Sequence, residues 1–544
     1  MVRALVIDAL ARYKGKRYST FDVVGAGPRI VAGIIESTGH DVLLLSYEKF
    51  MANKKLAKNF QIILVSVMSQ DLGALKKIRD AVSNYNKRAK IVVGGPASYD
   101  YEYILGNRLA DLVVIGEGEI PIEKLFTSDV IDIIDDPPEL SRIPALAYMH
   151  KGKIELTSAS IRTPKEVLNR LKPWTKIGLS YDKPWFLRIY VEVTRGCSNF
   201  MRPRLRILGC IDCNVCINGT PRAKLYCPAQ IPPGCGFCSV PSLFGPPRSR
   251  SIESIVSEIE GLIDNGAERI VLSAPDFLDY MREELVHPDP LTDPCNPPPN
   301  YDAIENLFSR IYEIDEVRRG KVKIFIENIK ACLVDTRVAK IFERYIKGTT
   351  IHIGLETGDK EYNMLIGKPA DPARVVLACK ILSNHGLRPY VYLMYGLPYQ
   401  GFRTYRKTLE IIDKLRYVGV EKITLYKYTP LPRTAFEKLK PRIDKYREII
   451  EILKKRVNKF NYERKKELLD KTLEAYLILN KENMKWYGYP VMHGPTIFIK
   501  DKLDESLDGS KAMVKIVGIS SRYVWGRVVG IIDDYNEKRV SSLA

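Results

Sequence analysis

The sequence lacks two features that would place the protein in a membrane or on a secretory route. No stretch of about 18 or more apolar residues runs without interruption, so we expect no transmembrane helix. The apolar run at the N-terminus has no A-x-A cleavage pattern after it and is more typical of a first strand than of a signal peptide. These absences favour a cytoplasmic protein. Glutamine is also rare, with four in 544 residues, which favours a heat-adapted source.

Acidic residues are in deficit. The chain has 84 lysines and arginines against 65 aspartates and glutamates, which gives a formal net charge of +19 and a pI near 9.2. Such an excess favours a polyanionic partner, either a nucleic acid or an anionic membrane surface. A solvated basic surface without a special partner is the alternative that charge alone leaves open. The composition, 45% hydrophobic and 27% charged, is that of an ordinary globular protein with several domains.

Cysteine is absent from the first 196 residues and then becomes abundant. Seven of the ten cysteines lie between positions 197 and 238. An odd number fits disulfide pairing poorly, whereas the C-x-x-C steps in "CIDCNVC" and "CGFC" match the spacing of metal ligands. The cluster therefore predicts metal binding. Cys295, Cys332 and Cys379 stand apart, and we expect them to be free thiols without a special role.

Residues 1–130 alternate short apolar runs with helical stretches. Runs such as "DVLLLS", "QIILVSVM" and "KIVVGG" are continuously apolar, which predicts a doubly wound parallel sheet with helices on both faces. Gly94, Gly95, Gly116 and Glu117 stand at the carboxyl edge of this sheet, where such sheets bind ligands, and are candidate cofactor-binding residues. The alternative for the glycines is that they only make tight turns.

The rest of the chain is predicted to form four segments. Residues 131–187, with several prolines and mixed charge, are expected to be a surface connector. Residues 188–437 hold about six strand–helix units, which predicts a (β/α) partial barrel with its site at the carboxyl ends of the strands. Residues 438–483 are expected to be a helical linker, and residues 484–544 a small C-terminal β-barrel. The predicted fold class is α/β.

Four segments of this second series resemble one enzyme superfamily. "YVEVTRGC" ends its first strand at Cys197, and "CGFCSVPSLFGPPRSRSIESIVSEI" leads into its first helix. These two resemble the radical S-adenosylmethionine (SAM) superfamily, in particular its UPF0313 proteins, and "IGLETGDKEYNMLIGKP" and "YLMYGLPYQ" resemble its fourth- and fifth-strand motifs. The resemblance covers about 188–435. It implies a [4Fe-4S] cluster on three cysteines, an open iron that binds SAM, and one-electron cleavage of SAM to a 5′-deoxyadenosyl radical.

The cysteine spacing departs from the C-x3-C-x2-C loop of that superfamily, since 37 residues separate Cys197 from Cys235. A loop insertion is entropically cheap, so Cys197, Cys235 and Cys238 remain the expected cluster ligands. The inserted residues 201–233 carry four more cysteines as C-x2-C-x2-C-x10-C-P, which fits half of a ferredoxin site or a zinc knuckle. This predicted second metal site, for an Fe–S cluster or zinc, consists of Cys210, Cys213, Cys216 and Cys227. The alternative is that Cys227 replaces Cys197 at the SAM cluster.

The resemblance also implies contacts to SAM at the ends of three strands. Ser273 and Asp276 follow the second strand, Glu356 the fourth, and Gly396 and Pro398 the fifth. The alternatives are a solvated strand-end carboxylate for Glu356 and a plain turn for Gly396 to Pro398. An electron donor of the ferredoxin or flavodoxin type is a further implied partner.

Two flanking domains carry further resemblances. "SVMSQDLGALKKIRDAVSNYNKRAKIVVGGP" and "DLVVIGEGEIPIEKLF" resemble the cobalamin-binding domain that often precedes radical SAM cores. The D-x-H-x-x-G motif that gives cobalt a histidine would fall at "DALARY", where Leu10 and Tyr13 stand instead. The domain therefore either binds cobalamin without a ligand from that loop or is an empty scaffold. "GPTIFIKD" and "GSKAMVKIVGISSRYVWGRVVGI" resemble the RNA-binding TRAM domain of methylthiotransferases.

Three functions remain open at this point. The leading hypothesis is a radical SAM enzyme that methylates or otherwise modifies tRNA or rRNA. The second is a radical SAM enzyme with a lipid or small-molecule substrate, whose basic charge serves membrane contact. The third is a non-enzymatic Fe–S or zinc protein that binds nucleic acid. A methylthiotransferase would hold a second cluster on three N-terminal cysteines, and this N-terminal domain has none.

Overall fold

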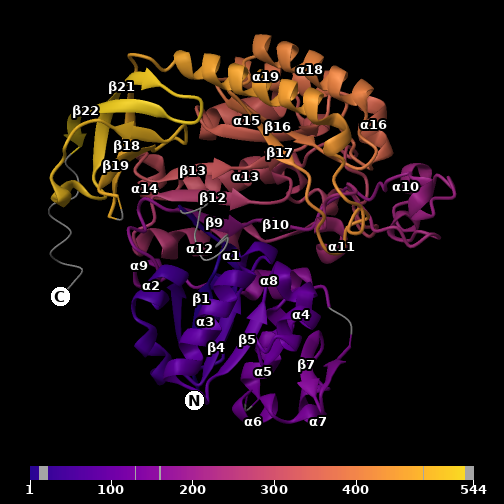
Figure 1. The fold of residues 1–544 in the computed structure, drawn as a ribbon, viewed down its shortest axis with the longest axis vertical. Helices are drawn as coiled ribbons and strands as arrows, with labels where there is room; N and C mark the ends of the chain where they lie inside the picture. The colour runs from indigo at the N-terminus through magenta and orange to yellow at the C-terminus, as the bar shows by residue number, and fades with distance from the viewer. Residues whose placement is uncertain (11–21, 129, 159–160, 482, 533–544) are drawn as a thin grey trace. The chain divides into compact units, whose positions relative to one another are not determined.

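The computed structural model describes residues 1–10, 22–128, 130–158, 161–481 and 483–532. The α/β chain divides into two compact units (Figure 1). The first unit comprises residues 1–198, 239–291 and 302–324, and the second comprises residues 199–238, 292–301 and 325–544. Among the described residues, no helix is both long and apolar enough to cross a bilayer.

A seven-stranded sheet in the order β3-β1-β4-β5-β6-β7-β8 forms the centre of the N-terminal region. Its strands are β1 (Arg3–Asp8), β3 (Asp41–Ser46), β4 (Ile62–Ser66), β5 (Lys90–Gly94), β6 (Leu112–Val114), β7 (Leu146–His150) and β8 (Lys153–Leu156). The first five pair in parallel, and the apolar side chains of β4 are buried. The helices are α1 (Ala26–Ser37), α2 (Tyr47–Ala52), α3 (Leu72–Tyr85), α4 (Tyr101–Gly106), α5 (Glu119–Thr127), α6 (Val130–Ile134) and α7 (Pro137–Leu140). The predicted doubly wound sheet is confirmed.

Strands β7 and β8 correct the prediction of a surface connector over residues 131–187. Strand β7 pairs antiparallel with β6, and β8 pairs antiparallel with β7, so this hairpin extends the N-terminal sheet. The pairing buries Leu146, Ala147 and Tyr148. The neighbouring prolines and charges hid this short apolar run in the sequence. The rest of the segment carries α8 (Lys165–Arg170) and α9 (Ile177–Ser180).

A second sheet, in the order β13-β12-β9-β2, begins the partial barrel. Its strands are β2 (Val23–Val24), β9 (Arg188–Glu192), β12 (Arg269–Ser273) and β13 (Lys323–Ile326). Strand β2 comes from the N-terminal region and pairs in parallel with β9. Asp22 stabilises this pairing because its carboxylate accepts hydrogen bonds from Arg188 at 2.8 and 3.0 Å. The associated elements are β10 (Thr194–Arg195), α11 (Val240–Phe244), β11 (Arg248–Ser249), α12 (Ile252–Asp264), α13 (Tyr301–Tyr312) and α14 (Asp315–Arg318).

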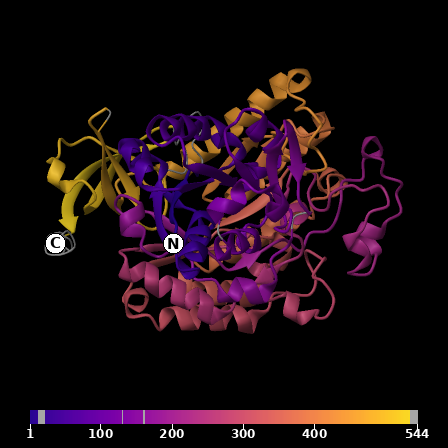
Figure 2. The ribbon, with the colours of Figure 1, turned by 90° about the horizontal axis from the view of Figure 1, so that it is seen from below.

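The second unit continues the strand–helix series with a parallel sheet in the order β14-β15-β16-β17. Its strands are β14 (Asn328–Ile329), β15 (Thr350–Glu356), β16 (Arg388–Tyr395) and β17 (Lys422–Lys427). Its helices are α15 (Thr336–Ile346), α16 (Lys360–Leu365), α17 (Pro372–Asn384), α18 (Phe402–Tyr417) and α19 (Arg447–Lys466). The predicted strands of the partial barrel are therefore present. The cysteine-rich insertion holds the short α10 (Val215–Asn218) and the 3-10 helices η5 (Arg206–Leu208) and η6 (Ala223–Leu225), and it extends away from this sheet (Figure 2).

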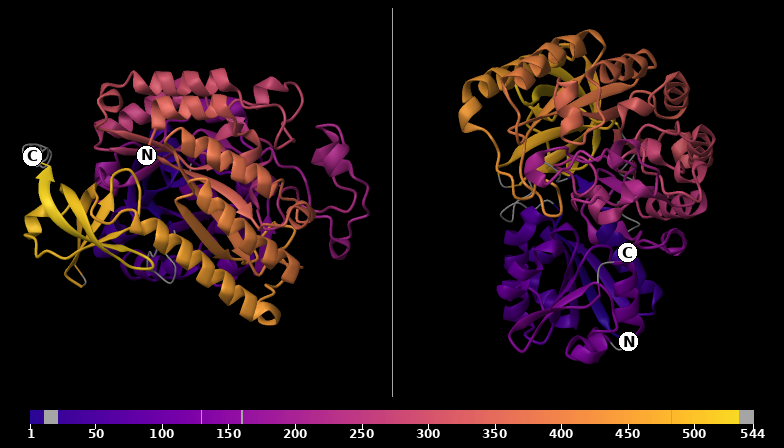
Figure 3. Two further views of the ribbon diagram at one scale, coloured as in Figure 1. Left: turned by 90° about the horizontal axis from the view of Figure 1, so that it is seen from above. Right: turned by 90° about the vertical axis from the view of Figure 1, so that its right-hand side faces the viewer.

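A closed barrel, in the order β18-β19-β20-β22-β21, ends the described chain. Its strands are β18 (Thr472–Asn480), β19 (Lys485–Pro490), β20 (Ile497–Ile499), β21 (Lys511–Ile519) and β22 (Val524–Ile532). Strand β18 corrects the predicted boundary, because it lies in the stretch expected to be a helical linker. The Lys- and Glu-rich sequence before it masks where the period changes from helix to strand. Helix α19 leads directly into the barrel (Figure 3).

Cys295 and Cys332 form a disulfide, which corrects the expectation that both are free. Their Cα atoms are 5.5 Å apart, within the range that a disulfide spans. Since 37 positions separate them, spacing alone gave no signal of this pairing. Cys379 is a free, buried thiol, as expected. Burial raises its pKa to about 12, so the thiol stays protonated and inert.

Candidate active site

The turn that carries Cys197 is fixed by a close backbone approach. Gly196 has φ +92°, and a Cβ atom there would lie 2.4 Å from the carbonyl oxygen of Pro246. The Cys197 N–H donates to the carbonyl of Gly245 at 3.0 Å. Only glycine fits at position 196, because a side chain there would clash with the Pro246 carbonyl. This close contact therefore fixes the backbone position of Cys197, directly after β10.

A buried carboxylate, which the sequence analysis missed, holds the next residue. Asp279 accepts from the backbone N–H of Ser198 at 3.1 Å and from its hydroxyl at 2.9 Å, and it pairs with Arg282. Asp279 and Arg282 are both buried. No motif marks them, because they are brought to Ser198 only by the fold. They fix the Cys197 turn from the side of the protein interior.

The predicted SAM contacts of the first unit lie after β12. Ser273 is the last residue of β12, and its carbonyl accepts from the Val193 N–H at 2.9 Å. Asp276 is buried and accepts from the Leu278 N–H at 3.2 Å, so it caps a short 3-10 turn. Both residues stand at the carboxyl edge of the sheet. Their contact with SAM stays a prediction.

In the second unit, the "CGFC" turn is held between two backbone segments. The Gly236 N–H donates to the Ile366 carbonyl at 2.9 Å, and the Gly236 carbonyl accepts from the Phe436 N–H at 2.8 Å. A Cβ atom on Gly236 would lie 2.5 Å from the Phe436 ring. Phe237 packs against the apolar cluster that contains Phe436. The positions of Cys235 and Cys238 therefore depend on tertiary packing.

Polar side chains surround these two thiols. Asn199 donates to the Cys235 sulfur at 3.3 Å and to the Gly367 carbonyl at 2.9 Å. Lys368 pairs with Glu356 at 2.9 Å. Burial alone would lower the pKa of Lys368, but Glu356 and the thiolates of Cys235 and Cys238 raise it above its usual range. Lys368 therefore stays charged and favours thiolates, the form that binds iron.

Glu356 and the turn after β16 bear on the two alternatives raised by the sequence. Glu356 is only 6% exposed and has φ +66°, so it is not a solvated strand-end carboxylate. Gly396 has φ +78° and donates to the Tyr405 hydroxyl at 3.2 Å. The Pro398 carbonyl accepts from the Tyr362 hydroxyl at 2.6 Å. Gly396 and Pro398 thus form an anchored turn, and a SAM contact there stays a prediction.

The four cysteines of the insertion line one small cavity of about 20 Å³. In the described chain, no three or more His, Cys, Asp or Glu side chains converge closely enough to ligate an ion, so a bound metal would draw these thiols together. Arg202 anchors the loop through the carbonyls of Phe200, Lys224 and Ile231. Burial lowers the pKa of Arg202, and the thiolates of the insertion oppose that shift.

The N-terminal sheet carries a larger cavity of about 320 Å³ at the carboxyl ends of its parallel strands. Gly94, Gly95 and Gly116 line it, and their contact with a cofactor stays a prediction. Gly95 has φ +91°, and a Cβ atom there would lie 2.8 Å from the Val67 carbonyl oxygen. These glycines thus make tight turns and also open the space. Leu10, which stands at the histidine position of the D-x-H-x-x-G motif, lines the cavity, and Tyr13 lies outside the described residues.

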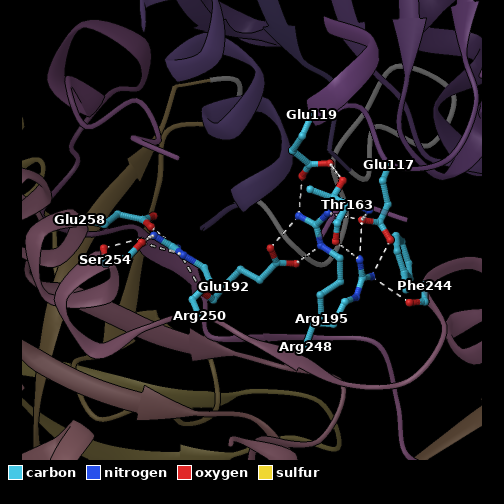
Figure 4. Close-up of polar contacts among 10 residues, drawn as sticks. All are labelled: Glu117, Glu119, Thr163, Glu192, Arg195, Phe244, Arg248, Arg250, Ser254 and Glu258. Atoms are coloured by element: carbon cyan, nitrogen blue, oxygen red, sulfur yellow. Dashed lines mark hydrogen bonds and ion pairs between the residues drawn. The ribbon is translucent and has the colours of Figure 1, made fainter. Parts of the chain in front are cut away.

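Glu117 also lines this cavity, but its carboxylate is fully engaged by protein donors (Figure 4). One oxygen accepts from Arg248 at 2.6 Å, and the other accepts from Arg195 and the Thr163 N–H at 2.9 Å each. Its role in the described structure is therefore to hold two arginines. A direct contact with a cofactor would require one of these bonds to break.

Arg195 is the centre of this buried network. It pairs with Glu119 at 2.6 Å and with Glu192 at 2.8 Å, besides Glu117. Burial alone would raise the pKa of Glu119, but Arg195 holds it below its usual range. Arg195 lines the cavity and lies two residues before Cys197. One side chain thus links the wall of the cavity to the strand that leads into the cysteine turn, a link that no sequence motif indicated.

Comparison with known proteins agrees with this architecture. The family model described as "Radical SAM superfamily" matches residues 232–412, and the one described as "B12 binding domain" matches residues 17–126. The solved structure of the radical SAM methyltransferase TsrM from Kitasatospora setae, with cobalamin and a [4Fe-4S] cluster bound, is similar in fold. Its TM-score is 0.58 at 12% identity, over 80% of this chain and 77% of that one. The chain is therefore a radical SAM enzyme with a B12-binding domain.

Two curated proteins are similar to this chain in sequence. The Methanocaldococcus jannaschii protein MJ1620 is 39% identical over 534 residues, which cover 97% of this chain and 99% of that protein. The chain belongs to the same family as MJ1620. The tRNA-2-methylthio-N(6)-dimethylallyladenosine synthase of Thermosipho melanesiensis is a more distant relative, 23% identical over 55% of this chain and 65% of that protein. The predicted radical SAM and cobalamin-binding resemblances are confirmed.

Gly236→Ala should displace the turn that carries Cys235 and Cys238. The new Cβ atom would overlap the Phe436 ring, and an ångström of misplacement costs about 100-fold in rate. We expect SAM cleavage, measured as 5′-deoxyadenosine after anaerobic reconstitution, to fall by about this factor. Gly106→Ala is the matched control, because no atom lies within 4 Å of a Cβ there. Equal activity of the two variants would contradict the packing argument.

Proposed function

We propose that this enzyme uses a SAM-binding [4Fe-4S] cluster and cobalamin to methylate an RNA substrate. Cys197, Cys235 and Cys238 are the proposed cluster ligands, and all three are of intermediate exposure. When bound, the cluster would supply the electron that cleaves SAM, and cobalamin would supply a carrier for the methyl group. Support for methyl transfer comes from the cavity in a domain that matches the B12-binding family. An electron donor of the ferredoxin or flavodoxin type is part of the proposal.

The protein's own contribution to this chemistry is positioning. Gly196 and Gly236 fix the backbone on which the cluster thiols stand, and Lys368 favours their ionised form. Ser273, Asp276, Glu356, Gly396 and Pro398 are proposed to hold SAM at the strand ends. The side chain of Leu10 has no nitrogen that could ligate cobalt, so cobalamin would bind without an imidazole from that loop. The glycine-lined floor would admit a flat ring close to the backbone.

The four cysteines of the insertion are proposed to hold one zinc ion. Four thiolates complete a tetrahedral shell, which suits a closed structural site. Their C-x2-C steps match the spacing of zinc ligands, and all four thiols line one cavity. The insertion has little secondary structure of its own, so a metal would supply much of its stability.

The observation that favours RNA is an aromatic cluster on the outside of the C-terminal barrel. Phe498 and Tyr523 have ring centroids 4.1 Å apart, Trp525 lies 5.3 Å from each of them, and Lys500 sits 5.7 Å from the Trp525 ring. The barrel core instead contains Trp486. Half-buried aromatic rings beside lysines are a platform on which unpaired bases stack. The distant tRNA-modifying relative supports the same substrate class.

The cysteine assignment is tested by single substitutions. Cys197→Ala, Cys235→Ala and Cys238→Ala should each abolish 5′-deoxyadenosine formation, because a cluster with two ligands is lost. Cys213→Ala should spare SAM cleavage and lose one zinc per chain, measured by elemental analysis. Wild-type SAM cleavage by Cys197→Ala would reject Cys197 as a ligand and favour Cys227.

Cobalamin binding is tested with hydroxocobalamin. After gel filtration we expect about one corrinoid per chain and no protein imidazole on cobalt, so the nitrogen coupling in the electron paramagnetic resonance spectrum of the Co(II) form should not change when the protein is labelled with ¹⁵N. Gly95→Ala should reduce retention, because its Cβ would strike the Val67 carbonyl. Gly39→Ala is the matched control, since Gly39 also has a positive φ but no neighbour within 4 Å. Wild-type protein that retains no corrinoid would remove cobalamin from the reaction.

The RNA platform is tested by two tryptophan substitutions. Trp525→Ala should weaken binding of a tRNA transcript by about 1–3 kcal/mol, the value of one stacked base, while the barrel stays folded. Trp486→Ala should instead unfold the barrel, since emptying a buried aromatic site costs about 3–5 kcal/mol. Filter binding and circular dichroism distinguish these effects. Unchanged tRNA affinity for Trp525→Ala would argue against RNA as the partner of this face.

A further inference from the structure

A large cavity in the second unit lies outside every site described above. It has a volume of about 860 Å³, the size of a small-molecule or nucleotide site. Residues of β16, β17, α19 and the start of β18 line it, together with the turns at 490–495 and 521–522. Figure 3 shows α19 running from the sheet to the barrel, so these elements are neighbours in one unit.

The lining is strongly basic. Its cations are Arg388, Lys422, Lys454, Arg464, Lys465, Lys471 and Arg522. Three carboxylates also line it, and two of these are paired to arginines, Glu421 with Arg388 and Glu467 with Arg464. The cations outnumber the carboxylates of the lining by four, or by three once Glu451, the partner of Lys454, is included, which makes the cavity attractive to an anion.

Lys465 shows that this charge is not compensated locally. Its Nζ donates to the carbonyl of Ser521 at 2.5 Å, a neutral partner rather than a carboxylate. Burial and the nearby charge of Lys422 lower the pKa of Lys465 to about 8. An anion that enters the cavity would therefore stabilise the charged form of Lys465.

The cavity is continuous in sequence with the aromatic face of the barrel. The Ser520 N–H donates to the Tyr523 carbonyl at 2.9 Å, which closes a tight turn. Within this turn Arg522 lines the cavity, and the Tyr523 ring packs against Phe498 outside it. An RNA chain whose bases stack on the aromatic face of the barrel would therefore reach the cations of the cavity beside the turn at 520–523.

We propose that this basic cavity binds the sugar–phosphate backbone of the RNA substrate, beside the bases that stack on the aromatic face of the barrel. The inference rests on the proposed RNA substrate and adds the place where its phosphates bind. Asn458 and Tyr395 offer an amide and a ring within the same cavity for the sugar or a base. The opposite signs of protein and RNA also predict that salt weakens the complex.

The test compares two double variants with the same change in charge. Lys465→Gln with Lys471→Gln removes two cations of the cavity, and Lys455→Gln with Lys459→Gln removes two exposed cations of α19 that do not line it. With the full chain and a tRNA transcript, we expect about tenfold weaker binding for the cavity variant relative to the control. The slope of log affinity against log salt should also fall by about 1.4–1.8, the value of two phosphate contacts.

Each outcome decides between the cavity and RNA binding itself. If tRNA binds and Trp525→Ala weakens it, but both lysine variants bind alike, the cavity is overturned and the RNA substrate stands. If the wild type binds no tRNA, both are overturned. If the cavity lysines matter instead for phosphatidylglycerol vesicles, the ligand is an anionic lipid and the inference fails. Equal melting temperatures of the two lysine variants verify that neither loss reflects unfolding.

Discussion

The buried charge of Arg195 is the interaction on which the site of the first unit depends. Three carboxylates, Glu117, Glu119 and Glu192, surround it. Ionised groups leave water at a cost of several kcal/mol each, and close pairing offsets that cost only when every partner is present. Loss of one partner from a buried pair costs about 3–5 kcal/mol of folding free energy, so the network is stable only when all its partners are present. It holds one wall of the cofactor cavity and the strand before Cys197 in a single arrangement.

Close backbone approach is the second constraint at the site. At Gly95, Gly196 and Gly236 a Cβ atom would lie under 3 Å from another backbone or ring. Each of these glycines sits on a loop assigned to a cofactor. The thiols and the cavity wall are therefore positioned by packing rather than by the spacing of the cysteines along the chain. The proposed ligand set Cys197, Cys235 and Cys238 is compatible with the long insertion, because a ligand set requires geometry and tolerates any loop length that reaches it.

The barrel illustrates how strand alternation separates stability from function. Successive residues of a strand face opposite sides, so Val524 enters the core while Trp525 lies outside it, and Trp486 enters while Tyr487 does not. The aromatic rings outside the core form one platform. In the tight turn at 520–523, Arg522 lines the neighbouring cavity and lies next to this platform in sequence. The two tryptophans of the barrel, Trp486 and Trp525, thus differ in burial because of their register in the strands.

The sequence by itself determined the parallel sheets, the partial barrel and the radical SAM motif, because these depend on local hydrophobic periodicity and on short runs such as "CGFC". It also placed Gly94, Gly95 and Gly116 at their cavity. Only the tertiary structure decided the β7–β8 hairpin, the start of the barrel at β18 and the Cys295–Cys332 disulfide. It also showed that Glu117, a candidate cofactor-binding residue in the sequence, pairs with two arginines. These features join residues tens of positions apart, and the free energy of such contacts lies in burial and charge pairing, which leave no periodic trace in a single sequence.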